Sequence, residues 1–336
     1  MKELKDNFLR VIDYLRLSIT DRCNLRCVYC MPPEGIVPSK HKEILTYEEI
    51  IRIVQIGAGL GVRKVRLTGG EPLTRKNITF LVSSIKKIRG IEDLSMTTYG
   101  VLLEKYAREL SDAGLDRVNV SLDSYNPARY REITRGGSLD AVLRGIAAAE
   151  KAGLCPIKIN MVPMRGINDD EVKDFARLTL NSDYQMRFIE FMPAGDNEYW
   201  SADRYISTEQ LKAEIETIAP LTPVRVRKNG PSKYFRLDGA KGVVGFISAI
   251  THHFCEDCNR LRLTSDGKLR PCLFSETEID LKTALRSGEP DSEIERLLRL
   301  AIQVKPEGHN IGNTIALKGP SALSTARKRP MSKIGG

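Results

Sequence analysis

The chain has 336 residues, 41% of them hydrophobic and 28% charged, a balance typical of a globular protein with a substantial core. It contains no run of about 18 apolar residues, and its first segment, MKELKDNFLR, is charged, so we expect neither a membrane span nor a secretory signal. Seven cysteines then favour metal or redox chemistry in a reducing compartment over disulfides, which predicts a cytoplasmic protein.

The net charge of +9 arises from 52 Lys and Arg against 43 Asp and Glu. Such a balance suits an anionic partner, which could be a nucleotide, a nucleic acid or an acidic protein. No signature of a nucleic-acid-binding fold is present. Charge alone therefore does not decide the partner.

Six strand–helix units follow one another in the first part of the chain. The predicted strands are Tyr14–Thr20, Lys64–Thr68, Asp93–Thr97, Arg117–Leu122, Pro156–Val162 and Gln185–Phe191. Thr46 and Glu49 form a capping box that opens a helix to about Ala58, and later helices are expected over Ile78–Ile88, Val101–Ala113, Ser138–Ala152 and Asp169–Leu180. Repeated units of this kind form a parallel sheet with right-handed crossovers. Six units are too few for a closed eight-stranded barrel, so the sheet is either open and doubly wound or curved like a partial barrel.

The pattern changes after residue 193. We expect a capped helix from Ser207, strands at Val224–Arg227, Lys233–Leu237 and Val243–Ile250, a hairpin at Asp266-Gly267, and helices at Ile279–Arg286 and Ser292–Val304. The sequence therefore predicts an N-terminal domain over residues 1–193 and a C-terminal α+β part over 194–336, packed against the barrel mouth.

Three cysteines follow the first predicted strand in the spacing C-x3-C-x2-C: Cys23, Cys27 and Cys30. Three thiolate ligands on an iron–sulfur cluster leave one iron open to a substrate or cofactor. The alternatives are a zinc site with a distant fourth ligand, or buried thiols without a metal. Zinc sites more often use paired C-x2-C units, so the spacing favours the cluster.

A second trio, Cys255, Cys258 and Cys272, has the spacing C-x2-C-x13-C. It could hold a second cluster, or zinc with His252 or His253 as a fourth ligand. Arg260 and Arg262 lie two residues apart in a predicted strand and so share one face. Guanidinium groups beside a metal site suit phosphate oxygens.

Other unusual residues also lie on the predicted strands or directly after them, where parallel barrels gather their chemistry. They include Gly69-Gly70-Glu71-Pro72, whose glycines allow backbone to approach a ligand closely. Three cations lie within predicted strands: Arg16, Arg66 and Lys158. Burying a cation without an opposite charge costs free energy. An anionic ligand would explain them, and so would pairing with acids of the barrel such as Glu71, Asp123 and Glu190. This convergence predicts an enzyme.

The motif C-x3-C-x-aromatic-C followed by GGEP resembles the radical S-adenosylmethionine superfamily. The second trio, in FCEDCNRLRLTSDGKLRPCLF, is similar to that of the GTP 3′,8-cyclase family of molybdenum cofactor biosynthesis, as are LRLSITDRCNLRCVYCMP, VRLTGGEPL, RFIEFMP and the terminal Ile334-Gly335-Gly336. The resemblance implies a partial (β/α)6 barrel, a TIM-like barrel with an α+β extension over its mouth. It also implies two four-iron–four-sulfur clusters at opposite ends of one cavity, held by the two cysteine trios.

The same resemblance implies the ligands. Positions matching the family's S-adenosylmethionine contacts are Tyr29, Gly70, Ser121 and Met192, and those matching its GTP contacts are Arg16, Arg66, Thr97, Lys158, Arg260 and Arg262. In the family, a 5′-deoxyadenosyl radical removes the ribose 3′ hydrogen of GTP, and the sugar carbon bonds to guanine C8. Expected partners are cyclic pyranopterin monophosphate synthase, an electron donor and a second copy of the chain, with no nucleic acid and no membrane.

Two positions depart from the family pattern. Tyr99 stands where the family usually has Asn in Thr-Thr-Asn-Gly, which bears on the neighbouring Thr97, and Ala249 follows GFIS where proline is common nearby. Two other functions remain open from the sequence. One is a radical enzyme acting on a peptide or RNA, and the other is a zinc-stabilised nucleic-acid-binding module.

Overall fold

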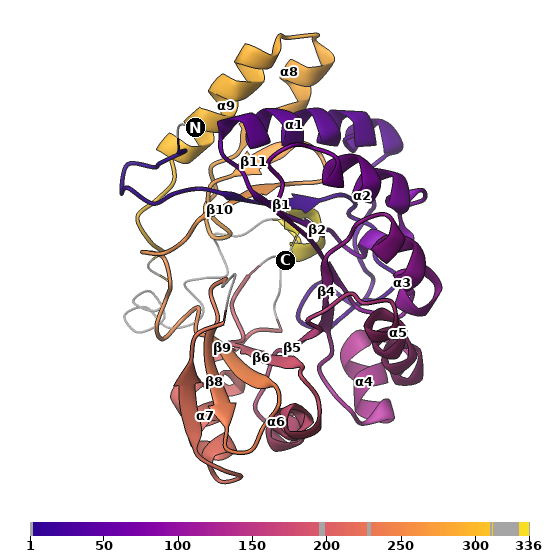
Figure 1. The fold of residues 1–336 in the computed structure, drawn as a ribbon, viewed down its shortest axis with the longest axis vertical. Helices are drawn as coiled ribbons and strands as arrows, with labels where there is room; N and C mark the ends of the chain where they lie inside the picture. The colour runs from indigo at the N-terminus through magenta and orange to yellow at the C-terminus, as the bar shows by residue number, and fades with distance from the viewer. Residues whose placement is uncertain (1–2, 195–198, 227–229, 310, 312–328, 336) are drawn as a thin grey trace.

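The computed structural model describes residues 3–194, 199–226, 230–309, 311 and 329–335. Its strands form one twelve-stranded sheet in the order β12-β11-β10-β1-β2-β3-β4-β5-β6-β9-β8-β7, which curves around a central space (Figure 1). The strands of the first half are β1 (Tyr14–Ser18), β2 (Lys64–Thr68), β3 (Asp93–Thr98), β4 (Arg117–Ser121), β5 (Lys158–Met161) and β6 (Gln185–Ile189). These six pair in parallel and in sequence order, as in the predicted partial barrel.

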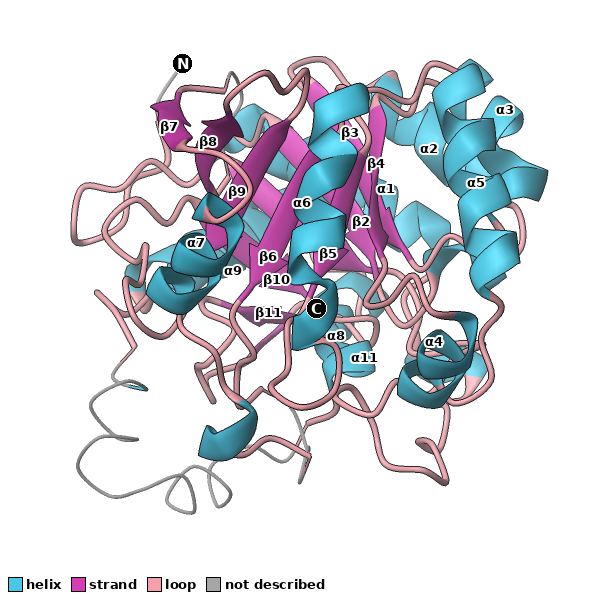
Figure 2. Ribbon diagram, turned by 90° about the horizontal axis from the view of Figure 1, so that it is seen from below, coloured by secondary structure: helices cyan, strands magenta, loops and turns pink. Residues whose placement is uncertain are grey.

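Helices lie on the outer face of the curved sheet (Figure 2). They are α1 (Tyr47–Leu60), α2 (Ile78–Lys86), α3 (Leu103–Asp112), α4 (Pro127–Thr134), α5 (Leu139–Lys151), α6 (Val172–Asn181), α7 (Thr208–Glu216), α8 (Lys282–Arg286) and α9 (Asp291–Gln303). The short α11 (Met331–Ile334) lies on the inner side instead, where Met331 lines the cavity. The predicted capping box is present, since the Thr46 hydroxyl accepts a hydrogen bond from the Glu49 amide and the Glu49 carboxylate accepts one from the Thr46 amide. No helix in these ranges is both long and apolar enough to cross a bilayer.

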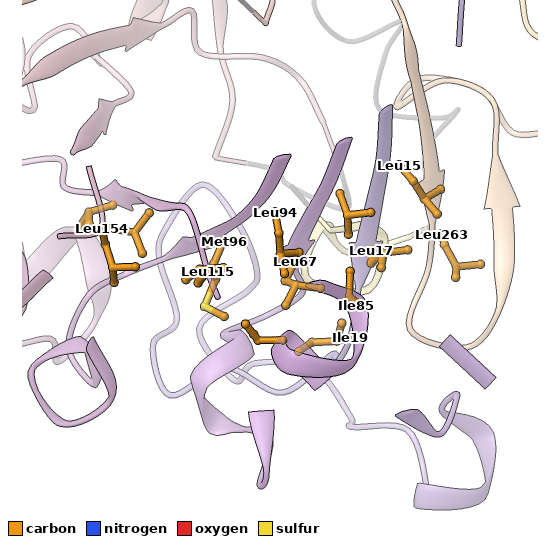
Figure 3. Close-up of a cluster of buried hydrophobic side chains, with 14 of the residues drawn as sticks. Leu15, Leu17, Ile19, Leu67, Ile85, Leu94, Met96, Leu115, Leu154 and Leu263 are labelled. Carbon is orange, nitrogen blue, oxygen red and sulfur yellow. The ribbon is translucent and has the colours of Figure 1, made fainter. Parts of the chain in front are cut away.

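The core lies between the sheet and the helices because successive side chains of a strand point to opposite faces. In β1, Leu15 and Leu17 are fully buried and belong to one hydrophobic cluster with Ile85 of α2, which lies beside Leu17 (Figure 3). The residues that alternate with them, Tyr14 and Arg16, line the interior cavity instead. The same alternation places an apolar layer under the helices and polar side chains inside the curve.

Strands from the C-terminal half extend this sheet at both edges. They are β7 (Leu221–Val224), β8 (Lys233–Leu237), β9 (Val243–Ile247), β10 (Arg260–Leu263), β11 (Lys268–Arg270) and β12 (Ile279–Asp280). β10 runs parallel to β1, and β9 runs parallel to β6. The expectation that this half only packs against the barrel mouth was therefore incomplete, because β9 and β10 belong to the sheet. The predicted division at residue 193 stays a prediction.

Three predictions of secondary structure were wrong. Helix α4 was missed, although Asn126 caps it by accepting hydrogen bonds from the Ala128 and Arg129 amides and Pro127 is favourable in a first turn. Ile279 and Asp280 form β12 because they pair with β11, so the helix starts only at Lys282. β7 ends at Val224, where the predicted strand began; Arg227, at the end of that prediction, lies outside the described residues.

Candidate active site

A large cavity occupies the interior of the curved sheet. It is lined by every predicted site residue except Cys23 and Cys27, namely Arg16, Tyr29, Cys30, Arg66, Gly70, Thr97, Ser121, Lys158, Met192, Cys255, Cys258, Arg260, Arg262 and Cys272. Residues that are up to 256 positions apart in the sequence (16 and 272) thus face one space. The polar faces of the strands and both cysteine loops make up its wall.

The first cysteine trio lies in a small apolar cluster just beyond β1. Cys27 and Cys30 are buried, Cys23 is partly exposed, and all three are free thiols. Leu25 and Met31 pack with them, and Tyr99 lies against the same cluster. Burial raises the pKa of Cys23 to about 12 and that of Cys30 to about 11. A bound cationic metal centre would supply the positive charge that these thiolates need.

The glycine pair after β2 packs directly on this cysteine loop. A Cβ on Gly70 would lie 2.2 Å from the Arg22 carbonyl oxygen, and one on Gly69 would lie 2.4 Å from that of Thr20. The Gly70 amide donates to the Thr20 carbonyl at 2.8 Å, and the Glu71 amide to that of Arg22 at 2.8 Å. Only glycine allows the two backbones to come so close.

Glu71 connects the loops that follow β2 and β3. Its carboxylate accepts hydrogen bonds from the Leu73 amide at 3.0 Å, the Thr98 hydroxyl at 2.8 Å and the Tyr99 amide at 2.8 Å. Burial raises the pKa of Glu71 to about 7. The carboxylate therefore orders the loops around the first trio.

Candidate contacts for S-adenosylmethionine converge near this trio. Tyr29 comes from the cysteine loop, Gly70 from the loop after β2, Ser121 from the end of β4, and Met192 from the segment after β6. The Tyr29 hydroxyl donates to Asp123 Oδ2 at 2.6 Å. Burial raises the pKa of Asp123 to about 6.

The second cysteine trio lies at the opposite end of β1. Cys258 precedes β10 by two residues, and Cys272 follows β11, which runs antiparallel to β10. Because β10 is parallel to β1, both cysteines lie at the amino-terminal end of β1, whereas the first trio follows its carboxyl end. A strand rises about 3.3 Å per residue, so the five residues of β1 separate the trios by roughly 15 Å.

Positive charge surrounds the second trio. Burial opposes ionisation of Cys258, but Arg260 and Lys305 outweigh it and lower the pKa of this thiol to about 6. His252, a predicted fourth zinc ligand, is within 2.8 Å of Glu209 instead. No three His, Cys, Asp or Glu side chains in the described ranges are arranged to share a single metal ion.

Several buried cations line the cavity between the two trios. Arg16 and Arg66 lie side by side in register across β1 and β2, and Arg16 pairs in the same way with Arg262 across β1 and β10. Burial, and then the charges of Arg187, Arg117 and Arg66, lower the pKa of Lys158 to about 6. Lys158 has no ion-pair partner in the described part of the chain.

In the part of the chain that the structure describes, Glu71, Asp123 and Glu190 form no ion pair with Arg16, Arg66 or Lys158 and accept other hydrogen bonds. Glu71 and Asp123 accept the hydrogen bonds described above. Glu190 accepts from the Ile250 amide at 2.7 Å and from the Thr208 hydroxyl at 3.0 Å. Pairing with these acids, the alternative left open by the sequence, is therefore not the arrangement in this fold.

The end of the chain also enters the cavity. Met331 of α11 lines it, and the Gly335 carbonyl accepts a hydrogen bond from Arg262 Nη1 at 2.7 Å. A Cβ on Gly335 would lie 2.4 Å from Thr68 Oγ1. Gly336 lies outside the described residues.

Comparisons with known proteins agree with this geometry. The radical SAM superfamily model matches residues 17–179, and the Molybdenum Cofactor Synthesis C model matches residues 184–311. GTP 3′,8-cyclase of Thermodesulfovibrio yellowstonii is 53% identical over 99% of this chain and 100% of its own length. The enzyme of the same name from Alkaliphilus metalliredigens is 50% identical over the same shares.

The chain belongs to the GTP 3′,8-cyclase family. Among solved structures, Streptococcus suis SuiB bound to precursor peptide SuiA has a TM-score of 0.61 at 16% identity, covering 97% of this chain and 77% of SuiB. At that identity the likeness concerns the fold alone. It agrees with the partial barrel of the radical SAM superfamily.

Members of the radical SAM superfamily use a four-iron–four-sulfur cluster and S-adenosylmethionine. The residues after β1 fit that cluster, because three free thiols lie in one small group of packed side chains and Cys30 among them lines the cavity. Tyr99, the departure from the family pattern, hydrogen-bonds to Cys27 and Cys30. Its side chain is thus part of the thiol environment in this member of the GTP 3′,8-cyclase family.

Sequence reasoning missed two cations of the cavity, Arg187 and Lys305. Arg187 lies opposite Asn160 across β6 and β5, is 5% exposed, and its Nε has no hydrogen-bond partner among the described residues. Its position in QMRFIEF, alternating with apolar residues, was a usable signal of the kind that identified Arg16. Lys305 follows a helix, and nothing local in the sequence marks it.

Proposed function

We propose that this chain converts GTP to (8S)-3′,8-cyclo-7,8-dihydroguanosine 5′-triphosphate, an early step of molybdenum cofactor biosynthesis. The observation that carries the proposal is the cavity itself, which has a cysteine trio at each end and basic side chains between them. Relatives named GTP 3′,8-cyclase, which are 50% and 53% identical to this chain over nearly its full length, support it. The alternative of a peptide substrate leaves the paired arginines without a purpose, and the alternative of an RNA substrate has no full-length relative to support it among those named above.

The first trio, Cys23, Cys27 and Cys30, would hold the cluster that binds S-adenosylmethionine. When bound, the cluster and S-adenosylmethionine supply a hydrogen-abstracting carbon radical by one-electron cleavage of the sulfonium. The contacts assigned to the cofactor are Tyr29, Gly70, Ser121 and Met192. Gly70 offers close-packed backbone without a side chain. Asp123 fixes the position of the Tyr29 ring by accepting a hydrogen bond from its hydroxyl group.

GTP would lie along the strand faces between the trios. Arg16, Arg66, Lys158, Arg260 and Arg262 supply positive charge to its phosphates, with Thr97 beside them and Arg187 as an added candidate. Guanidinium groups bind phosphate oxygens through paired N–H donors, and burial strengthens each contact. Such binding holds the ribose and guanine in a fixed geometry, so that ring closure becomes intramolecular.

The second trio, Cys255, Cys258 and Cys272, would hold a second four-iron–four-sulfur cluster, and an iron without a protein ligand would be available to guanine. The lowered pKa of Cys258, and the three thiols around one lobe of the cavity, support a thiolate-bound centre there. The bond between His252 and Glu209 engages one of the two histidines of the Cys3His zinc alternative; the other, His253, has its ring 5.4 Å from that of His309. The roughly 15 Å spacing of the trios, estimated from strand rise, suits a nucleotide placed between them.

Further partners follow from the proposed reaction. They are cyclic pyranopterin monophosphate synthase, which would take the product, an electron donor for the first cluster, and a second copy of the chain as a homodimer. The split into domains 1–193 and 194–336 and the cytoplasmic location belong to the same proposal. The radical SAM model ends at residue 179 and the Molybdenum Cofactor Synthesis C model begins at residue 184, which supports a domain boundary slightly before residue 193.

Anaerobic reconstitution with iron and sulfide tests the proposal. Two four-iron clusters predict about eight irons per chain. GTP, S-adenosylmethionine and a reductant should then yield 5′-deoxyadenosine and the cyclised nucleotide together. Formation of neither product by the fully loaded protein would refute the cyclase assignment, and zinc without iron would favour the nucleic-acid-binding alternative.

A further inference from the structure

Two buried cations outside the predicted site hold the backbone of the second cysteine trio. They are Arg10, in the N-terminal segment, and Lys305, just after α9, and their residues are 8% and 3% exposed. Neither has a part in binding GTP or S-adenosylmethionine as described above. A buried cation is retained only where its hydrogen bonds and charge partners offset the cost of desolvation.

Arg10 joins three segments of the chain. Its Nε donates to Asp6 Oδ2 at 2.6 Å, and its Nη1 donates to the carbonyl of Cys255 at 2.7 Å. The carbonyls of Glu307 and Pro306 accept from Nη1 and Nη2, each at 2.7 Å. One guanidinium thus fixes a cysteine ligand and the segment after α9 at once.

Asp6 prepares Arg10 for this contact. Its second carboxylate oxygen accepts hydrogen bonds from the Phe8 and Arg10 amides, both at 3.0 Å. The resulting tight turn directs the Arg10 side chain inward. Asp6 and Arg10 form an ion pair whose side chains are 0% and 6% exposed, so water does not compete for it.

Lys305 binds the backbone near the other two cysteines of the trio, Cys258 and Cys272. Its ammonium donates to the carbonyl of Arg260 at 2.9 Å, two residues after Cys258. It also donates to the carbonyl of Pro271 at 2.7 Å, the residue directly before Cys272. Together, Arg10 and Lys305 bind a backbone carbonyl at each cysteine of the trio or within two residues of it. Their charges also lie near the thiol groups.

We propose that Arg10 and Lys305 are positioning residues that shape the second cysteine trio for its cluster and stabilise the charge of the loaded site. The proposal rests on the second cluster proposed above. Partners that orient metal ligands typically contribute 10- to 100-fold to metal retention, by analogy with other metal sites. A nearby positive charge also favours the reduced form of a cluster, because reduction adds an electron.

The test uses the full chain carrying Cys23→Ala, Cys27→Ala and Cys30→Ala, so that bound iron reports the second trio alone. Arg10→Met and Lys305→Met are made in that background and reconstituted. A chelator should remove iron about 10- to 100-fold faster from each variant than from the parent. The midpoint potential of the remaining cluster should become more negative in both, a change that loss of packing alone does not require.

Arg52→Met is the matched control. Arg52 also joins a carboxylate and a carbonyl, those of Asp291 and Glu289, but these contacts are exposed and involve no residue of the trio's backbone. It should leave iron loss and potential unchanged. Should Lys305→Met fail to fold without metal, Lys305→Gln provides the same comparison, since its amide can still donate to one carbonyl.

The outcomes separate the two proposals. A parent that binds no iron in this background would refute the second cluster. A parent that binds iron, with Arg10 and Lys305 variants that release it at the control rate and at an unchanged potential, would overturn only the positioning role. Faster release from these variants but not from Arg52→Met, together with the negative shift, supports it.

Discussion

Arg16 of β1 and Arg262 of β10 are direct neighbours in the parallel register of the sheet. Adjacent strands lie about 4.8 Å apart, so two guanidinium groups share one buried face. Burial lowers the pKa of both, and Arg260 lowers that of Arg262 further, to about 10. The fold thus holds like charges together in the absence of a ligand, and a triphosphate would relieve their repulsion.

Arg16→Met should therefore weaken GTP binding while stabilising the ligand-free protein. Loss of a buried charge contact to phosphate typically costs about 2–5 kcal/mol, and removal of one of two adjacent buried like charges relieves their repulsion in the ligand-free protein. Calorimetric titration with GTP and thermal unfolding without it measure the two effects. Arg144→Met, which removes an exposed pair with Glu104, should change neither. Tight GTP binding by Arg16→Met would contradict the assignment.

Lys158 should make GTP binding pH-dependent. Its pKa in the ligand-free fold is about 6, below the usual value of 10.5, so near neutral pH the amine is mainly uncharged. An adjacent phosphate favours the charged form, so binding takes up close to one proton at about pH 8 and weakens as the pH rises. Calorimetric titrations with GTP in buffers of different ionisation enthalpy measure how many protons are taken up on binding. Lys158→Met should abolish the uptake, and uptake that persists in this variant would assign the proton to another group.

The same pKa shift has a consequence for stability. The unfolded chain keeps Lys158 protonated up to about pH 10, whereas the fold releases the proton near pH 6, so stability attributable to this residue rises with pH between those values. Denaturant unfolding from pH 6 to 9 should show a smaller rise for Lys158→Met than for the parent. Equal slopes would mean that the Lys158 pKa is not lowered in the fold.

Gly70→Ala should loosen the first cysteine trio. The new Cβ would lie 2.2 Å from the Arg22 carbonyl oxygen, so the cysteine loop must move, at a cost of about 1–3 kcal/mol. The measurement is made in a chain that also carries Cys258→Ser, so that bound iron reports the first trio. In that background, Gly70→Ala should lower the amount of bound iron. Gly59→Ala is the control, because nothing lies within 4 Å of its added Cβ and alanine favours the helix by roughly 1 kcal/mol. Equal iron in both variants would mean that the close packing is not needed.

The sequence predicted the barrel strands well because alternation is a local signal. β2 was predicted with its exact bounds, since charged and apolar residues alternate in KVRLT between clear helices. The inward cations Arg16 and Arg66 follow from the same alternation. Arg187 carries it too, in β6, and was overlooked.

Pairings between distant segments could not be predicted in this way. Nothing near Arg260 indicates that its strand lies parallel to β1, about 250 positions earlier in the chain. That pairing places the second trio opposite the first. Lys305 is another example, because its role depends on the carbonyls of Arg260 and Pro271, which only the folded chain brings to it.

In the proposed mechanism, the first cysteine trio generates the radical and the second directs GTP to it. The decisive measurement is product analysis after anaerobic turnover with GTP and S-adenosylmethionine, comparing the parent chain with Cys258→Ser. Cys258→Ser should still form 5′-deoxyadenosine but no cyclised nucleotide. Cyclisation at the parental rate by Cys258→Ser would contradict this mechanism.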